Sequence, residues 1–294
     1  MIEPVEVTLG TPFYNSEVYL KDYFGVLGSM TYPKDFINLK LIDNGSTDKT
    51  LACLVDYADN HHQEYQAVEV GIVSQEDKYS DTRKERWNII NVRNQILDKA
   101  RGHIVMMDSD VIPPADFIEI LLELIRQGAG IGGGLSIVVT GLLRDPKTGR
   151  ELRYVPQLTA WTLHLDNTYR SIGAIDFNRP HIAELAPEHI NSILRVDTIG
   201  TGLCVINQVL KDLRFQYNAQ YGEDFHFCQM VDKLGYPILV HTGLWYDHTH
   251  YLYQKIDDGK KFLIVFKGIE RSKGAAFVKE AKIVGNQRKG GHSP

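Results

Sequence analysis

Short apolar runs alternate with segments of helical periodicity over the first 128 residues, and this alternation limits the possible folds more than any other feature. The runs that predict strands lie at residues 5–9, 39–42, 68–73 and 104–107. Each is followed by apolar residues three and four positions apart, the spacing of an amphipathic helix. Alternation of this kind implies right-handed βαβ units and a mostly parallel sheet with helices on both faces. We therefore predict an α/β fold.

The regular alternation stops after Gly128. The glycine-rich residues 130–134 lack the G-x-x-x-x-G-K-[ST] order of a phosphate loop, so we predict that they serve tight packing. Residues 141–195 predict a meander or an insertion. A strand at 203–206, a helix around Phe227 and a strand at 238–241 then restore the order.

The charge of the chain restricts its partners. A formal net charge of −5 argues against a protein that coats nucleic acid, so any bound nucleotide is expected to be a small one. Residues 255–294 nevertheless carry an excess of Lys and Arg. A solvated tail is the simpler interpretation, and contact with a membrane surface or an acidic partner is the alternative.

The three cysteines and the N-terminus indicate the compartment. Cys53, Cys204 and Cys228 are far apart in apolar surroundings, which predicts buried free thiols rather than a zinc site or a disulfide framework. The N-terminus has no signal-peptide pattern, and no run reaches the ~18 apolar residues of a membrane span. We expect a cytoplasmic protein, with peripheral attachment to a membrane as the alternative.

Acidic residues follow the fourth predicted strand, at the edge of a parallel sheet where ligands bind. Asp108 and Asp110 in Asp108-Ser109-Asp110 could hold a divalent cation, Mn²⁺ or Mg²⁺, against a diphosphate. The alternative is capping of the helix that follows. His248 or His250, after the strand at 238–241, could complete such a site, although isolated histidines are often plain polar residues.

A second acidic pair, Glu223 and Asp224, precedes an apolar-periodic helix. The positive end of the helix dipole favours the ionised form of both carboxylates, so one of them could act as a base. Ordinary acidic charge at a helix N-terminus is the alternative.

Five segments in this order resemble the family 2 glycosyltransferases and their relatives with the GT-A fold, over roughly residues 5–250. The segments are Pro12-Phe13-Tyr14-Asn15-Ser16-Glu17, Asp43-Asn44-Gly45-Ser46-Thr47-Asp48, Arg93-Asn94, Asp108-Ser109-Asp110 and Gly222-Glu223-Asp224. The resemblance implies a GT-A catalytic domain over 1–252, with a nucleotide-binding part (1–128) and an acceptor-side part (129–252). A basic extension (253–294) follows.

The same resemblance implies transfer of a hexose-type sugar to an acceptor hydroxyl, from a UDP-sugar by preference or from a GDP-sugar. The residues implied in nucleotide-sugar binding are Thr11, Pro12, Tyr14, Asn15, Asp43, Asn44, Gly45, Ser46, Arg93, Asp108 and Ser109. Asp108, Asp110, His248 and His250 would hold the metal, and Gly200, Thr201, Gly202 and Trp245 would line the acceptor side. Asp224, with Glu223 beside it, would be the base of an inverting reaction. Val92 stands where the family has alanine before the arginine.

Other functions remain open at this stage. A retaining glycosyltransferase would use the same site without a carboxylate base. A nucleotidyltransferase or phosphohydrolase would also suit metal-binding carboxylates on a parallel sheet, but the glycine-rich early loop of the sugar nucleotidyltransferases is missing. A GT-A-like protein that binds without turnover is the last alternative. No segment indicates whether the acceptor is a glycan, a lipid or a protein.

Overall fold

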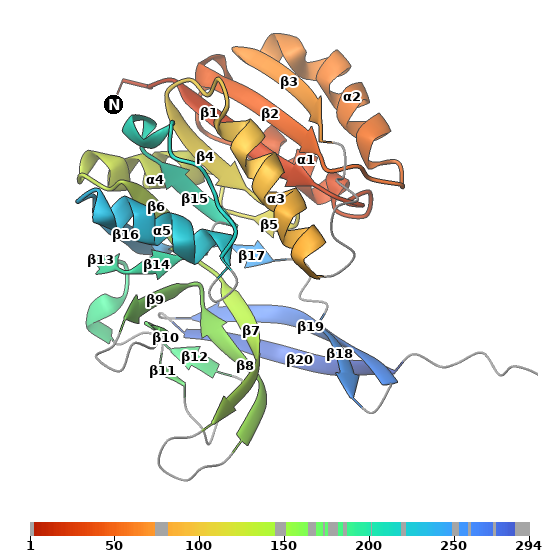
Figure 1. Cartoon of the computed structure of the whole chain (residues 1–294), viewed down its shortest axis with the longest axis vertical. Helices are drawn as coiled ribbons and strands as arrows, with labels where there is room; N and C mark the ends of the chain where they lie inside the picture. Colours follow the sequence, from red (N-terminus) through yellow and green to blue (C-terminus); the bar gives the residue numbers. More distant parts are fainter. Residues whose placement is uncertain are drawn as a thin grey trace, which may run out of the picture.

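The computed structural model describes residues 3–73, 82–144, 151–163, 169–172, 174–175, 182–184, 187–200, 202–218, 222–248, 253–257, 260–272 and 275–285. Its central feature is an eight-stranded sheet with helices on both faces (Figure 1). In sheet order the strands are β13 (Ile193–Val196), β16 (Ile238–Trp245), β6 (Ile131–Leu135), β15 (Leu203–Ile206), β4 (His103–Met107), β1 (Val7–Phe13), β2 (Ile37–Asp43) and β3 (Ala67–Ile72). The predicted α/β class is confirmed.

β1, β2, β3 and β4, the first four strands along the chain, form the parallel half of the sheet. β1 pairs with β2 on one side and with β4 on the other, and β3 extends the sheet beyond β2. Because the connections run outward in opposite directions from β1, a switch point lies between β1 and β4, where open α/β sheets bind ligands. β15 pairs antiparallel with both β4 and β6, so the other half of the sheet is mixed.

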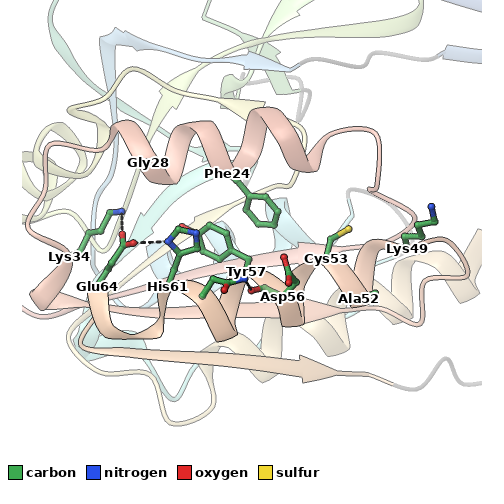
Figure 2. Close-up of a pocket in the computed structure, with 11 residues that line it drawn as sticks. Phe24, Gly28, Lys34, Lys49, Ala52, Cys53, Asp56, Tyr57, His61 and Glu64 are labelled. Atoms are coloured by element: carbon green, nitrogen blue, oxygen red, sulfur yellow. Dashed lines mark hydrogen bonds and ion pairs between the residues drawn. The ribbon is translucent and has the colours of Figure 1, made fainter.

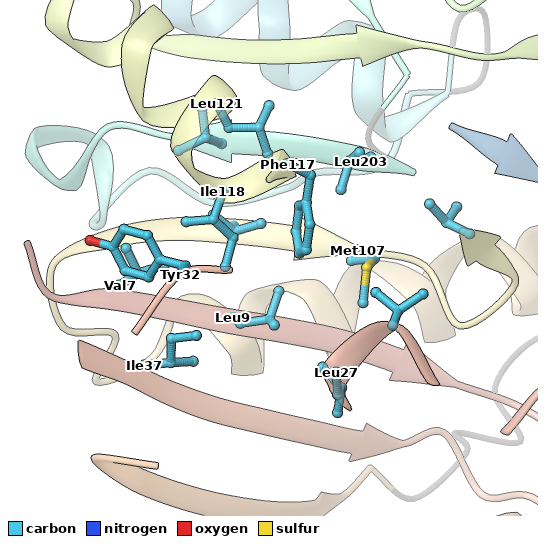
Figure 3. Close-up of a cluster of buried hydrophobic side chains, with 14 of the residues drawn as sticks. Val7, Leu9, Leu27, Tyr32, Ile37, Met107, Phe117, Ile118, Leu121 and Leu203 are labelled. Carbon is cyan, nitrogen blue, oxygen red and sulfur yellow. The ribbon is translucent and has the colours of Figure 1, made fainter. Parts of the chain in front are cut away.

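Helices cover the sheet on two sides, and alternate residues of the strands face each side. On one side α1 (Leu20–Ser29), α2 (Thr50–His61) and α4 (Phe117–Arg126) pack against residues such as Leu9 and Met107 (Figure 3). On the other side α3 (Thr82–Leu97) and α5 (Glu223–Lys233) pack against Ile104 and Met106. Four 3₁₀ turns connect these elements: η1 (Lys34–Phe36), η2 (His62–Glu64), η3 (Pro187–His189) and η4 (Gln208–Leu210).

The glycine-rich residues form β6, a fully buried strand, and their predicted packing role is confirmed. A Cβ atom on Gly132 would lie 2.7 Å from Leu124 Cδ1, and one on Gly134 would lie 2.5 Å from the carbonyl oxygen of Leu244. The strand is therefore glycine-rich because α4 and β16 approach its backbone closely.

Residues 137–199 contribute short antiparallel strands in their described parts, as the meander prediction requires. β7 (Ile137–Arg144) pairs with β8 (Glu151–Leu158), and β9 (Ala160–Leu163) lies between β10 (Tyr169–Ser171) and β14 (Thr198–Ile199). Figure 1 shows these small sheets gathered at one end of the molecule, beyond the eight-stranded sheet.

The basic C-terminal segment differs from the solvated tail that its charge suggested. Its described residues form β18 (Tyr253–Asp257), β19 (Lys260–Ser272) and β20 (Ala275–Gly285). β20 pairs with β12 (Ile182–Glu184), which in turn pairs with β11 (Ala174–Ile175). Apolar runs such as residues 262–266, rich in strand-forming side chains, explain this outcome. The domain boundary after residue 252 remains a prediction.

The cysteines agree in part with the expectation that all three are buried free thiols. Cys204 and Cys228 are buried free thiols as predicted, whereas Cys53 is only half-buried. None of the helices in the described ranges has both the length and the apolar character that a membrane span requires.

Candidate functional site

The loops that follow β1 and β2 interlock at the carboxyl edge of the sheet. The backbone N–H of Asn15 donates to Ser46 Oγ at 2.9 Å, and the N–H of Thr47 donates to Asn15 Oδ1 at 2.8 Å. Asn15 has a φ of 48°, a left-handed conformation that asparagine tolerates better than most residues. These reciprocal bonds make the two loops one structural unit.

Asp43 ends β2 and organises the second loop. One of its oxygens, Oδ2, accepts from the N–H groups of Gly45 and Ser46, both at 3.0 Å. The turn requires the positive φ of Gly45, 71°. The other oxygen, Oδ1, is buried and receives no hydrogen bond from the described residues. Such an oxygen at a ligand-binding edge is an acceptor for a group that enters with a ligand.

Two other residues predicted for nucleotide binding lie within β1 instead of the loop. Thr11 and Pro12 belong to this strand, which continues to Phe13, and both are buried. The hydroxyl of Thr11 accepts from the phenol of Tyr23 on α1 at 2.7 Å. Thr11 is thus bonded in the core, while Tyr14 just after the strand is 52% exposed.

The loop Asp108-Ser109-Asp110 lies beside the first two. Ser109 Oγ is 3.0 Å from Ser16 Oγ, and the N–H of Asp108 donates to the carbonyl of Gly202 at 2.8 Å. All three residues of this loop are half-buried. The site therefore lies at the switch point between β1 and β4.

Backbone pairing brings a candidate histidine to the same loop. β17 (Asp247–His248) pairs antiparallel with β5 (Val111–Ile112), and His248 lies opposite Val111, the residue after Asp110. The side chain of His248 and all of His250 and Thr201 lie outside the described residues.

Arg93 on α3 joins the Asp108-Ser109-Asp110 loop to α5. Its Nη1 lies 2.6 Å from Glu223 Oε1 and 3.4 Å from Asp224 Oδ1, and its Nη2 lies 3.6 Å from Asp108 Oδ1. Burial alone would lower the pKa of Arg93, but these carboxylates outweigh it and raise the pKa, so the guanidinium stays charged. Arg93 is 5% exposed, so these ion pairs are buried. Its predicted role in nucleotide-sugar binding stays a prediction.

Glu223 and Asp224 occupy the first turn of α5, where the sequence predicted a helix start. Burial, and then the neighbouring Asp224 carboxylate, raise the pKa of Glu223 to about 7 despite the opposing effect of Arg93. Two neighbouring carboxylates repel each other when both are ionised, so ionisation of Asp224 disfavours ionisation of Glu223. Near neutral pH, Glu223 therefore holds the proton of the pair more readily than a free glutamate would.

A pH-dependent stability follows from this raised pKa. A carboxyl group whose pKa is higher in the folded state stabilises the fold at acidic pH, and the effect is lost as pH rises through about 7. We expect wild type to lose about 1–3 kcal/mol relative to Glu223→Gln between about pH 5 and about pH 8. Urea unfolding of both proteins across this range measures the difference. The exposed Glu188→Gln serves as the control, and parallel curves for wild type and Glu223→Gln would contradict the assignment.

The residues predicted for the acceptor side belong to different elements. The carbonyl of Gly202 accepts from the N–H of Asp108, which places this residue beside the Asp108-Ser109-Asp110 loop. Half-buried Trp245 ends β16 opposite Leu135, and the N–H of Gly200 donates to the carbonyl of Thr159 at 2.9 Å. Their predicted role stays a prediction.

The sequence reasoning missed Tyr246, which is 1% exposed. Its hydroxyl lies 3.4 Å from Thr159 Oγ1. Burial raises its pKa, a bond with Thr159 opposes this, and the nearby Asp108 carboxylate raises it further, so the phenol stays protonated. No local motif marks this tyrosine, because its partners are far away in the sequence.

The donor set fits a small divalent cation. Among the described side chains, no group of three or more His, Cys, Asp or Glu is arranged to hold a metal ion. Cations such as Mg²⁺, however, are commonly held by one or two carboxylates, with water and substrate phosphates completing the shell. The half-buried carboxylates of Asp108 and Asp110 meet this requirement.

A separate groove of about 770 Å³ lies between α1 and α2 (Figure 2). Phe24 stacks on Tyr57 with 4.3 Å between ring centroids, and Glu64 pairs with both Lys34 (2.7 Å) and His61 (2.6 Å). The ring stack joins α1 to α2, and the ion pairs of Glu64 join η2 to η1 and to the end of α2. None of the Asp43, Asp108 and Asp224 carboxylates lines this groove.

Comparison with solved structures defines the fold. The structure of the mannosyltransferase PcManGT from Pyrobaculum calidifontis with GDP-Man and Mn²⁺ is similar, with a TM-score of 0.54, 15% sequence identity and 84% of this chain covered. A structure of GalNAc-T7 with UDP, GalNAc and Mn²⁺ also has a TM-score of 0.54, at 15% identity and 83% coverage. The chain spans 58% of the first protein and 43% of the second. The fold is that of the GT-A glycosyltransferases.

The sequence profile of Glycosyl transferase family 2 matches residues 8–171, more than half of the chain. This protein therefore belongs to glycosyl transferase family 2. A search of curated protein sequences returned no significant match.

Proposed function

We propose that this protein is a metal-dependent glycosyltransferase that moves a hexose-type sugar from a nucleoside diphosphate donor to an acceptor hydroxyl. The observation that carries the proposal is the Arg93 guanidinium, which joins the Asp108 loop to Glu223 and Asp224 beside the two interlocked loops. The Asp108 carboxylate, on the loop proposed for the leaving diphosphate, and the Asp224 carboxylate, proposed as the base, thus both lie beside the buried guanidinium of Arg93. Membership in the family supports the same activity.

The donor nucleoside binds at the two interlocked loops. The buried Oδ1 of Asp43 accepts a hydrogen bond from the base edge or from a ribose hydroxyl, while Tyr14, Asn15, Asn44 and Ser46 surround it. This leaves the diphosphate directed toward Ser109 and Arg93. UDP is the preferred nucleotide and GDP the second choice.

Asp108 and Asp110 would hold the divalent cation, Mn²⁺ or Mg²⁺, with His248 as the third protein ligand and His250 as its substitute. The chemistry that such a cation would supply is neutralisation of the charge that develops on the leaving diphosphate. The pairing of His248 with Val111 supports this ligand set. The structures of PcManGT and GalNAc-T7 each contain Mn²⁺ with a nucleotide or nucleotide sugar.

Asp224 acts as the base of an inverting transfer. Its carboxylate takes the proton of the acceptor hydroxyl while the hydroxyl oxygen bonds to the anomeric carbon, and the bond from that carbon to the diphosphate breaks on the opposite face. Arg93 orients Asp224 through its 3.4 Å contact, and Glu223 holds the extra proton of the pair.

The acceptor enters over Gly200, Thr201, Gly202 and Trp245, where small residues leave space for a sugar ring beside an indole. We place the catalytic domain at residues 1–252 and assign the basic segment 253–294 to acceptor or membrane-surface contact. A cytoplasmic location fits this assignment.

Calorimetric titration tests the proposal. The purified protein is titrated with UDP, GDP and their common sugar conjugates, once with Mn²⁺ and once with a chelator. Binding of one nucleotide family that strengthens at least about tenfold with Mn²⁺, about 1.4 kcal/mol, is the expected result. No binding of any of them would contradict the proposal and favour phosphoryl chemistry or a protein without turnover.

A further inference from the structure

Ser16 lies between the two interlocked loops and the loop Asp108-Ser109-Asp110, which is the metal-binding loop of the proposed function. Its contacts have no part in the reaction scheme above. It is 2% exposed. Its N–H donates to Thr50 Oγ1 at 2.7 Å, which fixes its backbone to the first residue of α2. Its hydroxyl lies 3.0 Å from that of Ser109, in a hydrogen bond that either group can donate. The same hydroxyl accepts from the N–H of Tyr14 at 3.2 Å and lies 3.3 Å from the carbonyl oxygen of Tyr14, so it bonds both to the loop after β1 and to the Asp108-Ser109-Asp110 loop.

The backbone of Ser16 is rigid because the chain on either side of it is also bonded to the second loop. Asn15 contacts Ser46, as described above, and the N–H of Glu17 donates to Asp48 Oδ2 at 3.1 Å. In return the N–H of Lys49 donates to Glu17 Oε2 at 3.2 Å. The hydroxyl of Ser16 is therefore held in place by the loops that bind the nucleoside in the proposed function.

The other end of this contact lies between the two metal-binding carboxylates. Ser109 lies between Asp108 and Asp110 in the sequence, so a hydrogen bond to the Ser109 side chain restrains both neighbouring aspartates. The N–H of Tyr19 donates to the carbonyl of Ser16 at 2.8 Å, so the backbone of Ser16 is also bonded to the residue before α1.

We propose that Ser16 is a positioning residue that couples the nucleoside loops to the metal-binding loop, so that nucleotide and cation bind cooperatively. This inference rests on the proposed function, because it assigns the ligands of the two loops. Because the two interlocked loops hold the Ser16 hydroxyl, a nucleotide bound to these loops stabilises the bond between Ser16 and Ser109 and thereby the position of Asp108 and Asp110 for the cation. By linkage, the cation strengthens nucleotide binding by the same factor.

The coupling factor is the nucleotide Kd in chelator divided by the Kd in Mn²⁺, measured by calorimetry with UDP or GDP. Loss of the hydrogen bond to Ser109 predicts that Ser16→Ala reduces this factor about three- to ten-fold. In a Ser109→Ala background, Ser16→Ala should not reduce the coupling factor further, since the Ser109 hydroxyl is already absent and only the contacts with Tyr14 are lost. An unchanged coupling factor in Ser16→Ala, or an equal further loss in the double variant, overturns the inference.

Thr8→Val is the matched control. The Thr8 hydroxyl is also fully buried and bonds across the sheet, accepting from the N–H of Arg101 and donating to its carbonyl, both at 2.8 Å. It lies at the opposite, amino end of β1. Thr8→Val should lower stability without changing the coupling factor.

Hydrogen exchange of the ligand-free protein distinguishes failure of this inference from failure of the proposed function. Ser16→Ala should accelerate exchange about three- to ten-fold in residues 108–112, whereas Thr8→Val should not. If wild type binds no nucleotide, the proposed function and the coupling both fall, whatever the exchange shows. If wild type shows the coupling, but Ser16→Ala changes neither the coupling factor nor the hydrogen-exchange rates of residues 108–112, only the role of Ser16 is contradicted.

Discussion

Asp224→Asn should reduce kcat by about 10²–10⁴-fold while the donor still binds with nearly wild-type affinity. Asparagine has the shape of aspartate, and its amide oxygen can still accept from Arg93 Nη1, 3.4 Å away in wild type. It cannot, however, take a proton from the acceptor hydroxyl. Arg93 keeps Glu223 and Asp108 as ionic partners, so the fold of the site should persist. Initial rates of transfer and calorimetric donor affinity measure the two effects separately.

Asp232→Asn is the matched control for this variant. Asp232 lies on the same helix, and its side chain is 56% exposed and only 3.5 Å from an exposed arginine, Arg195. An exposed ion pair of this kind contributes little, so kcat should stay close to wild type. Wild-type turnover in Asp224→Asn would remove the base assignment. Retention of the anomeric configuration, read from the NMR spectrum of the first product, would favour the retaining alternative instead.

The sequence predicted the parallel half of the sheet well, because each buried strand is followed by a clear helical period. The strand expected at 39–42 is β2, Ile37–Asp43, and it is longer because Ile37, Asn38 and Asp43 also pair with β1. Lys40 reaches Glu69 at 3.5 Å, a pairing that no local pattern indicates. Propensity could not identify β6 as a strand either, since its glycines are explained by the close approach of α4 and β16.

The candidate site was predictable in its residues but not in its contacts. Motif order identified Arg93, Asp108, Glu223 and Asp224, yet it assigned Arg93 to nucleotide-sugar binding and gave no indication of its ion pairs. Its partner Glu223 is 130 positions away in the sequence, and the Ser16–Ser109 contact spans 93 positions. Contacts over such separations depend on the order of strands in the sheet, which periodicity does not encode.

Asp110→Ala should abolish detectable transfer and the effect of Mn²⁺ on nucleotide affinity. Removal of one of two carboxylates leaves a single aspartate in this loop, while the cation is expected to supply several kcal/mol of charge stabilisation in the transition state. Because each ~1.4 kcal/mol is a factor of ten in rate, a loss of about 10³-fold or more is expected. Nucleotide affinity in chelator should be unchanged, since Asp43 and the interlocked loops are intact. Transfer assays and calorimetry with and without Mn²⁺ measure both results.

Asp116→Ala gives the matched comparison, and together the two variants separate metal binding from helix capping. Asp116 lies six residues further along the same connection, is exposed, and makes no side-chain capping bond to α4. It should therefore retain both transfer and the Mn²⁺ effect. If Asp110 only stabilised the start of α4, Asp110→Ala would lower the unfolding temperature and leave the Mn²⁺ effect intact. If it holds the cation, the Mn²⁺ effect disappears at an unchanged unfolding temperature, because the half-buried side chain leaves no core cavity.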